Sequence, residues 1–383
     1  MRIVIAPDSF KGSMSAAAAA EAIAAGLRRV RPDIDLTLVP MADGGEGTVE
    51  SMVDATGGQL IHQTVTGPLG EPVMAFYGLL GDGQTAVIEM AAASGLPLVP
   101  VGRRDPRITT TYGTGELVRA ALDKGARRFL IGIGGSATND GGAGFAQALG
   151  AKLIGVDGQP LPDGIGGGDL PKVARLDLSG LDPRLPECEF QVACDVDNPL
   201  CGSRGAAAVF GPQKGATPEM VAELDSALRR WAEVLLTATG KEVLEMPGAG
   251  AAGGLGGGLT ALLDAHLDRG VEIVIRATGL RERLQGAVLV FTGEGRMDFQ
   301  IVHGKTPAGV AAAAREAGAG PVIALVGGVG QGYEQAYTVG IDAVVPIPRG
   351  PMSLDEAMAE GPTLLADAAE RAFRFYIAAA ERR

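Results

Sequence analysis

The sequence predicts an α/β protein with two domains, one of them a parallel sheet built from both ends of the chain. Three observations support this prediction. Short runs rich in Val, Ile and Leu alternate with Ala-rich helical segments, which is the pattern of a parallel sheet covered by helices. The alternation is regular at both ends of the chain, and a different pattern interrupts it in the middle. The 383 residues are also enough for two ordinary domains.

Each end of the chain predicts strands and helices in turn. The N-terminal end predicts a strand at 3–5, a helix from Ser15 to about Arg29 and a strand at 36–39. The C-terminal end predicts strands at 288–291, 322–326 and 343–347, and helices at 307–317, at 333–338 and from Ser353 onward. These five strands suit the flavodoxin-like order 2-1-3-4-5, in which ligands bind where the strand order reverses. The loops 8–12 and 292–298 flank that point.

The middle of the chain predicts a second α/β domain. It begins with a meander of strands at 59–91, followed by a helix at 115–124, a strand at 129–131 and, after a glycine-dense loop, a helix ending near Leu149. Short strands follow at 151–195, and helices dominate 217–285 with a break at 247–258. We therefore predict one discontinuous domain, formed by 1–58 and 286–383, into which the second domain, 59–285, is inserted.

Composition and charge exclude several classes of protein. Glycine makes up 59 residues, but 46% of the chain is hydrophobic and 20% is charged, so neither collagen nor a disordered chain fits. The net charge of −12 argues against nucleic-acid backbones, which need a clustered positive surface. No apolar stretch is long enough to span a membrane, and the first residues lack a signal-peptide core. We expect a cytoplasmic protein that binds neither nucleic acid nor membranes.

Four polar, glycine-bearing loops follow predicted strands, at 7–13, 41–48, 132–142 and 292–298. Helix capping explains the serines of the first loop, but it does not explain Asp8 and Lys11 together. The second loop suits an Asp-Gly turn, a helix cap or a metal site. The third loop opens a helix, so its backbone N–H groups are suited to cradling a phosphate. The fourth gathers unlike charges at a strand end, which suggests either anion and metal binding or a surface ion-pair loop.

Other motifs are incomplete. The Gly132-x-Gly134-x-x-Ala137 pattern follows a strand, but 139–142 interrupt the place where a dinucleotide-binding helix should run. A second such pattern at 248–253 does not follow a strand, and a Walker A loop ending at 304–306 lacks its first glycine. Three histidines without paired spacing do not predict a zinc site. The segment 194–200 carries Asp195 and Asp197, which suit Mg²⁺ binding, activation of a hydroxyl or an Asx turn.

These loops resemble those of the bacterial glycerate kinases of glyoxylate and sugar-acid catabolism. The matching segments follow the family's order over nearly the whole chain: APDSFKGSMSA (6–16), ADGGEGT (42–48), GGSATNDGG (134–142), CDVDNPLCG (194–202), FGPQKGA (210–216), PGAGAAGGLGGG (247–258) and TGEGRMDFQ with GKTPAGVA (292–311). Met14, Met297 and the segment 301–303 depart from the family's pattern, and none of these departures touches a charged candidate residue.

The resemblance implies phosphorylation of D-glycerate by ATP with Mg²⁺, in a cleft between two domains. It implies 2-phospho-D-glycerate as the product, while 3-phosphoglycerate and a homodimer are left open. Two other functions also stay open. One is an NAD(P)-dependent oxidoreductase that acts on a small hydroxy acid and uses the loop 132–137. The other is a non-catalytic protein that binds small anions or sugar acids.

On this basis we assign roles to the candidate residues. Catalytic roles go to Asp195, as the preferred general base, and to Lys11 and Asp43. Substrate contacts go to Asp8, Ser9, Glu46, Arg296 and Asp298. Contacts to the nucleotide and its phosphates go to Gly134, Gly135, Ser136, Asn139, Asp140, Lys214 and Lys305. Metal binding goes to Asp197 and Glu294.

Overall fold

A computed structural model describes residues 1–380 of the chain. Its contacts divide the chain into two compact units. The first unit contains Met1–Asp43, Glu50–Gly57 and the residues from Val271 onward, and the second contains Gly44–Val49 and Gly58–Gly270. Each unit has its own sheet. The α/β fold class predicted from the sequence is therefore confirmed.

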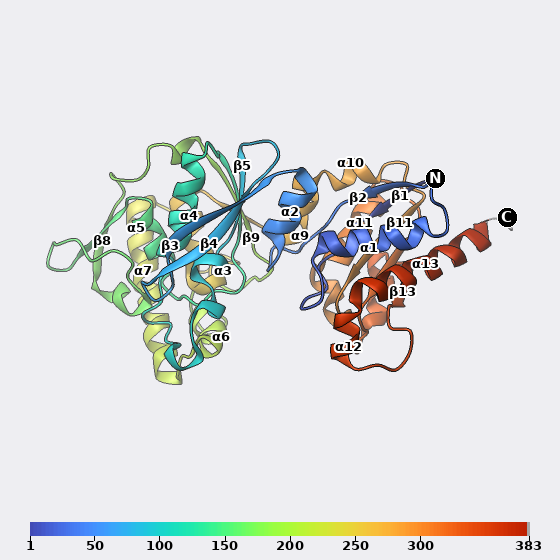
Figure 1. Cartoon of the computed structure of the whole chain (residues 1–383). Coiled ribbons are helices and arrows are strands. Elements are labelled where there is room, and N and C mark those ends of the chain that lie inside the picture. The colour runs from blue at the N-terminus through green and yellow to red at the C-terminus, as the bar shows by residue number, and fades with distance from the viewer. Residues whose placement is uncertain (381–383) are drawn as a thin grey trace. The chain divides into compact units, whose positions relative to one another are not determined.

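The first unit is built on a five-stranded parallel sheet (Figure 1) in the order β13-β12-β11-β1-β2. Its strands are β1 (Arg2–Ile5), β2 (Asp35–Leu38), β11 (Leu289–Glu294), β12 (Val322–Val326) and β13 (Ala343–Pro346). Numbered along the chain, this is the flavodoxin-like order that the sequence predicts. Every residue of β11 and β12 is buried, as expected for strands covered on both faces.

The helices of this unit are α1 (Ala16–Arg28), α2 (Thr48–Thr56), α9 (Gly270–Thr278), α10 (Leu280–Leu284), α11 (Thr306–Glu316), α12 (Leu354–Ala359) and α13 (Gly361–Ala380). Two of them, α1 and α11, match predicted segments closely, whereas α2 was not predicted. The side chain of Ser15 caps α1 by accepting a hydrogen bond from the Ala18 N–H at 3.2 Å. The predicted helix at 333–338 is a 3-10 helix, Tyr333–Val339. The last predicted helix is two helices, because α12 ends before Glu360 and α13 begins at Gly361.

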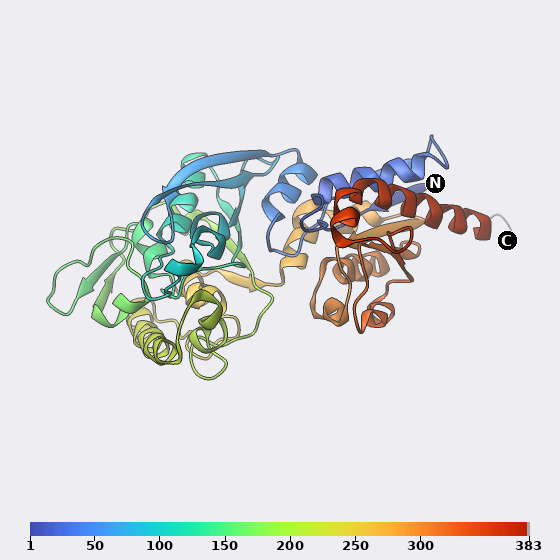
Figure 2. The same ribbon diagram turned by 60° about the horizontal axis from the view of Figure 1, so that its bottom comes forward.

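Helices α1 and α13 lie side by side in both views of the molecule (Figures 1 and 2). Gly26 of α1 lies so close to the carbonyl oxygen of Ala366 that a Cβ atom there would collide with it. Alanines along α1 present a flat face, and larger apolar residues such as Ile23 and Leu27 complete the core. The Ala-rich composition therefore gives close helix packing with few aromatic residues.

The second unit contains a six-stranded sheet in the order β10-β9-β6-β5-β4-β3 and a two-stranded sheet of β7 and β8. The strands are β3 (Gln59–Thr66), β4 (Pro72–Leu79), β5 (Thr85–Glu89), β6 (Arg128–Gly132), β7 (Lys152–Gly155), β8 (Val173–Asp177), β9 (Glu189–Ala193) and β10 (His266–Asp268). The predicted meander corresponds to β3, β4 and β5, which pair antiparallel. Strand β10 lies in a stretch expected to be helical, and it forms by pairing with the distant strand β9.

The helices of the second unit are α3 (Ala91–Ser94), α4 (Tyr112–Asp123), α5 (Ala143–Ala148), α6 (Ala206–Phe210), α7 (Pro218–Thr239) and α8 (Leu255–Leu263). Helix α8 begins inside the glycine tract that was expected to separate helices. Glycine has a low helix propensity, but the tertiary packing of this helix requires it at two positions. A Cβ atom at Gly256 or Gly258 would collide with the carbonyl oxygen of Gly248 or Gly141, respectively.

The contact division differs from the predicted domain limits at both ends of the insertion, because Gly44–Val49, predicted in the first domain, belongs to the second unit. Residues 271–285, which we placed in the inserted domain, belong to the first unit. The packing explains why: Gly309 of α11 lies against the side chain of Val271, and Thr278 faces Met41. A contact unit is not by itself a folding domain, so the predicted limits 1–58, 59–285 and 286–383 remain a prediction.

Candidate functional site

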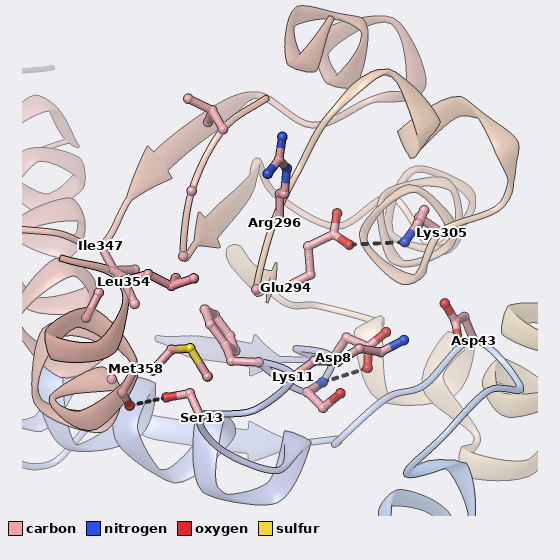
Figure 3. Close-up of a pocket in the computed structure, with 18 residues that line it drawn as sticks. Asp8, Lys11, Ser13, Asp43, Glu294, Arg296, Lys305, Ile347, Leu354 and Met358 are labelled. Atoms are coloured by element: carbon pink, nitrogen blue, oxygen red, sulfur yellow. Dashed lines mark hydrogen bonds and ion pairs between the residues drawn. The ribbon is translucent and has the colours of Figure 1, made fainter. Parts of the chain in front are cut away.

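The first unit has a cavity of about 430 Å³ at the carboxyl ends of its strands. The loops after β1, β11 and β12 line the cavity, as does the segment from Ile347 to Gly361 (Figure 3). This edge of the sheet is where the sequence predicts that a ligand binds. Seven of the predicted site residues line this cavity: Asp8, Ser9, Lys11, Asp43, Glu294, Arg296 and Lys305.

Asp8 is held in place by hydrogen bonds to both of its carboxylate oxygens. The Thr306 hydroxyl donates to Oδ2 at 2.6 Å, and the Ser9 N–H donates to Oδ1 at 2.6 Å. Burial raises the pKa of Asp8, and the nearby carboxylate of Asp43 raises it further. Asp8 therefore connects the first loop to the start of α11 and adds negative charge to the cavity.

Glu294 is the last residue of β11, and it is only 7% exposed. Its carboxylate lies 4.0 Å from the ammonium group of Lys305. Burial raises the pKa of Glu294 to about 8. Lys305 opposes this rise, whereas neighbouring carboxylates such as Asp8 and Asp43 add to it. The cavity thus contains a carboxyl group that exchanges its proton near neutral pH.

The cationic side chains of the cavity are more exposed than its carboxylates. The side chain of Arg296 is 73% exposed and lies 3.8 Å from the carboxylate of Asp298. Asp298 also accepts a hydrogen bond from the Gln300 N–H at 3.0 Å and so caps the turn Phe299–His303. Lys11 is exposed, and the side chain of Lys305 is 34% exposed. These cations are accessible to an anionic ligand.

The carboxylates of the cavity fit Mg²⁺ only with help from a ligand. Asp8 and Asp43 repel each other, and a divalent cation would relieve this repulsion. No group of three or more His, Cys, Asp or Glu side chains suited to a metal occurs among the described residues. Mg²⁺ in proteins is usually held by one or two carboxylates together with waters and substrate phosphates. The donor set therefore fits Mg²⁺ that arrives with a phosphate ligand.

The predicted phosphate loop of the second unit has an exposed tip and a buried end. Gly134 and Gly135 are exposed, whereas Ser136, Asn139 and Asp140 are buried. Asp140 accepts hydrogen bonds from the Thr111 N–H and hydroxyl at 2.8 and 2.7 Å, and from two N–H groups at the start of α5. Its carboxylate therefore joins this loop to the segment before α4.

Lys214 is also buried in the second unit, with 1% of its surface exposed. Its ammonium group donates to the carbonyl oxygen of Thr138 at 2.7 Å. Burial lowers the pKa of Lys214 to about 7, although Asp140 opposes this change. In the described part of the chain, the Asn139 amide group and the Thr138 hydroxyl are buried without a hydrogen-bond partner. Asn139, Asp140 and Lys214 thus form part of the protein interior.

The remaining candidates of the second unit lie in exposed loops. Asp195 follows β9 and accepts a hydrogen bond from the Gly270 N–H at 3.1 Å. Asp197 is paired with Arg204 at 2.8 Å, and its side chain is 77% exposed. Glu46 is exposed as well. Asp197 and Glu294, the predicted metal ligands, belong to different units.

The loop 132–142 differs from a dinucleotide-binding motif in the structure as well. Helix α5 begins only at Ala143 and is six residues long. Gly142 precedes it in a left-handed conformation, with φ +79°. A dinucleotide-binding loop instead leads directly into a long helix whose N-terminus faces the pyrophosphate. This geometry does not favour the oxidoreductase alternative.

Sequence reasoning missed part of the cavity wall. Ile347, Leu354 and Met358 line the cavity, yet none of them was a candidate. The strand predicted at 343–347 was a usable signal, because the loop after it must emerge at the same edge of the sheet. Thr306, the partner of Asp8, lay next to the candidate Lys305.

Comparisons with known proteins agree on one family. The family model described as "Glycerate kinase family" matches residues 3–377. A protein of Halalkalibacterium halodurans named glycerate kinase is 57% identical over 96% of each chain. A protein of Escherichia coli K12 named glycerate 2-kinase is 54% identical over 93% of each chain. A crystal structure of a Salmonella typhimurium LT2 protein matches with a TM-score of 0.92 and 50% identity, covering 100% of this chain and 99% of the other. The chain therefore belongs to the glycerate kinase family.

Proposed function

We propose that this protein transfers the terminal phosphoryl group of ATP to D-glycerate and forms 2-phospho-D-glycerate. Membership of the glycerate kinase family supports the reaction, and the name of the 54% identical Escherichia coli relative supports the position of the phosphate. The structural observation that carries the proposal is the cavity of the first unit, where cations and carboxylates together line the carboxyl edge of a parallel sheet. We also propose that it acts in the cytoplasm.

The cations of the cavity suit the anions of this reaction. Phosphoryl transfer depends mainly on positioning and on neutralising negative charge. Lys11, Arg296 and Lys305 lie where they can hold the glycerate carboxylate or the transferring phosphoryl group. Asp8 and Ser9 would orient the substrate beside them. Asp298 acts on the substrate through Arg296, whose guanidinium group it contacts.

Mg²⁺ would be held through Glu294, with Asp43 close enough to affect its pKa, and through oxygens of the ATP phosphates. When bound, Mg²⁺ neutralises part of the phosphate charge. A carboxyl group with a pKa near 8 gives up its proton readily when a cation approaches, which makes Glu294 a suitable ligand. Asp197 remains a proposed metal ligand in the second unit.

The second unit would contribute Asp195 as the general base and Glu46 as a substrate contact. Asp195 is exposed at the end of a parallel strand, and the Gly270 N–H fixes one of its oxygens. The exposed backbone of Gly134 and Gly135, together with Ser136, would contact a phosphate. Asn139, Asp140 and Lys214 remain proposed contacts to the nucleotide phosphates, and Lys214 is held beside the loop by its hydrogen bond to the Thr138 carbonyl oxygen.

Phosphorus NMR tests the proposed function. Purified protein is supplied with ATP, Mg²⁺ and D-glycerate, and the expected result is the resonance of 2-phospho-D-glycerate together with ADP. The resonance of 3-phosphoglycerate would overturn the assigned position while keeping the kinase. If the protein is folded and no phosphoglycerate forms, the function itself is overturned, whether or not ATP is consumed.

A further inference from the structure

The cavity of the first unit has two chemically different halves. The charged half contains the carboxylates and cations described above. The other half is apolar and is lined by Phe10, Val329, Ile347, Leu354, Ala357 and Met358. Figure 3 shows Ile347, Leu354 and Met358 together on one side of the cavity, and Asp43 and Lys305 on the opposite side. A ligand that fills the cavity must therefore be apolar at one end and anionic at the other.

D-Glycerate does not match a cavity that is apolar at one end and charged at the other. Each of its three carbons carries oxygen, so it has no apolar surface to place against a wall of Leu, Ile and Met. A cavity of about 430 Å³ is also of the size that holds a drug-sized ligand rather than a three-carbon acid. The apolar half thus calls for a larger partner.

Part of the apolar wall is exposed, although Phe10 and Ile347 are buried. Leu354 is 73% exposed and Val329 is 44% exposed, although both line the cavity. Exposed apolar side chains that gather in a concave site gain free energy when a ligand covers them. A flat aromatic ring is the ligand group that covers such a wall with little loss of conformational entropy.

The wall is also fixed in place before any ligand binds. The Ser13 hydroxyl donates to the carbonyl oxygen of Met358 at 2.6 Å, which ties α12 to the first loop. Ser353 and Glu356 form a capping box that fixes the start of α12. Gly361 lies against Ser13 so closely that a Cβ atom would collide with its hydroxyl. A rigid wall lowers the entropy cost of binding.

Gly328 lies beside open space at the edge of the cavity. It follows β12, lines the cavity, and a Cβ atom built on it would meet no atom within 4 Å. Its neighbour Gly327 is different, because a side chain there would collide with the carbonyl oxygen of Gly295. A substitution at Gly328 therefore fills cavity space without disturbing the packing of the sheet.

From these observations we infer that this cavity is the nucleotide site, with the adenine ring on the Ile347–Leu354–Met358 wall and the phosphates toward Lys11, Arg296 and Lys305. This inference rests on the proposed function, since it takes ATP as the phosphoryl donor. It assigns glycerate to a place outside the apolar half. It also names Leu354 and Met358 as base-binding residues, which the sequence alone did not indicate.

Calorimetric binding of ADP, adenosine and D-glycerate to the full-length protein tests the inference. Leu354→Asp and Gly328→Val should each weaken ADP binding by about tenfold or more, because a charge or a bulky group replaces ring contact. The matched controls are Phe375→Asp, which changes another exposed apolar residue of the same unit, and Gly350→Val, which changes another glycine with open space. Both controls should bind ADP as the unmodified protein does.

Adenosine has no phosphates, so its binding measures the contribution of the apolar half of the cavity alone. Leu354→Asp should weaken both adenosine and ADP, whereas Arg296→Gln should weaken ADP and leave adenosine unchanged. Glycerate binding, measured without nucleotide, should survive Leu354→Asp and Gly328→Val. Unchanged ADP binding in both Leu354→Asp and Gly328→Val, the two wall variants, would overturn the inference. A loss of glycerate binding equal to the loss of ADP binding would overturn it as well.

The outcome for the nucleotide site is independent of the outcome for the reaction. If phosphoglycerate forms but the wall variants bind ADP normally, the site assignment fails and the kinase stands. If the wall variants lose ADP binding but the unmodified protein forms no phosphoglycerate, the kinase fails and the nucleotide site stands. Circular dichroism of each variant shows that it is folded, and Gly328→Val decides the question if Leu354→Asp does not fold.

Discussion

Each of the two units contains a lysine near a buried carboxyl group, and the two pairs differ in their surroundings. In the first unit, Lys305 and Glu294 line a cavity, and the lysine side chain is 34% exposed. In the second unit, Lys214 and Asp140 are buried at 1% and 0% exposure. Both pairs lie next to glycine-rich loops that looked like ligand sites in the sequence. The difference teaches that the exposure of the lysine distinguishes the two pairs, since both carboxyl groups are buried and only Lys305 is open to a ligand of the cavity.

Asp140→Ala should produce the largest effect, and it should act on stability. The carboxylate accepts hydrogen bonds from Thr111, Gly142 and Gly144, so its removal leaves several buried donors without a partner. We expect a loss of about 3–5 kcal/mol in the free energy of unfolding, measured with urea. Asp197→Ala is the control, because its exposed ion pair should contribute less than about 1 kcal/mol. A normally stable Asp140→Ala protein would show that the pair is not part of the fold.

Glu294→Gln should change how stability depends on pH. The pKa of Glu294 is about 8 in the folded protein against an ordinary value of 4.5, so between these values the folded state holds a proton that the unfolded state has lost. The stability that this proton provides is complete below pH 4.5 and is lost as the pH rises toward 8.

Between pH 5 and 7.5 this loss amounts to about 3 kcal/mol at most, from 1.36 kcal/mol per unit of pKa difference. The glutamine variant should lack this part of the decline when both proteins are unfolded with urea across that range. Parallel stability curves for the two proteins would contradict the burial of an ionisable group at this position.

Arg296→Gln should reduce activity without reducing stability. Its guanidinium group is exposed at the cavity and meets the anions of the reaction only when ligands bind. We expect kcat/KM for glycerate phosphorylation to fall about a hundredfold, or about 2.7 kcal/mol.

Arg175→Gln is a close control for this variant. Arg175 also lies 3.8 Å from a carboxylate two residues along the chain, and its side chain is 62% exposed, but it does not line the cavity. Its kcat/KM and its melting temperature should not change. Equal activity in both variants would remove Arg296 from the site.

The parts of the fold that follow from local pattern could be predicted from the sequence. The buried strands, the helix capped by Ser15 and the order of the five-stranded sheet depend on hydrophobic runs and turn residues, which a sequence displays directly. Strand β10 depends on pairing with β9, more than 70 residues away, and three residues give no periodic signal of their own.

Only the charged residues of the candidate site could be predicted from the sequence. The loops with Asp8, Lys11, Glu294 and Lys305 were found because charged residues between glycines at strand ends are unusual in an ordinary turn. The apolar wall was missed because Leu354 and Met358 look like core residues in a helix, and only the structure shows Leu354 to be 73% exposed. Asn139 and Lys214, which the sequence also marked, are buried inside the second unit, and their predicted phosphate contacts stay a prediction.

Lys214→Met should change the free energy of unfolding least. Its effect on stability should depend on pH in the opposite sense to that of Glu294→Gln. The pKa of Lys214 is lowered from 10.5 to about 7 in the folded protein, so the unfolded state binds the extra proton between these values. The contribution of Lys214 to stability is therefore present above pH 10.5 and is lost as the pH falls toward 7. Relative to the methionine variant, the unmodified protein should gain about 1–2 kcal/mol between pH 7 and 8.5. Urea unfolding at both pH values measures this, and a difference that shrinks with rising pH would mean that Lys214 stays charged beside Asp140.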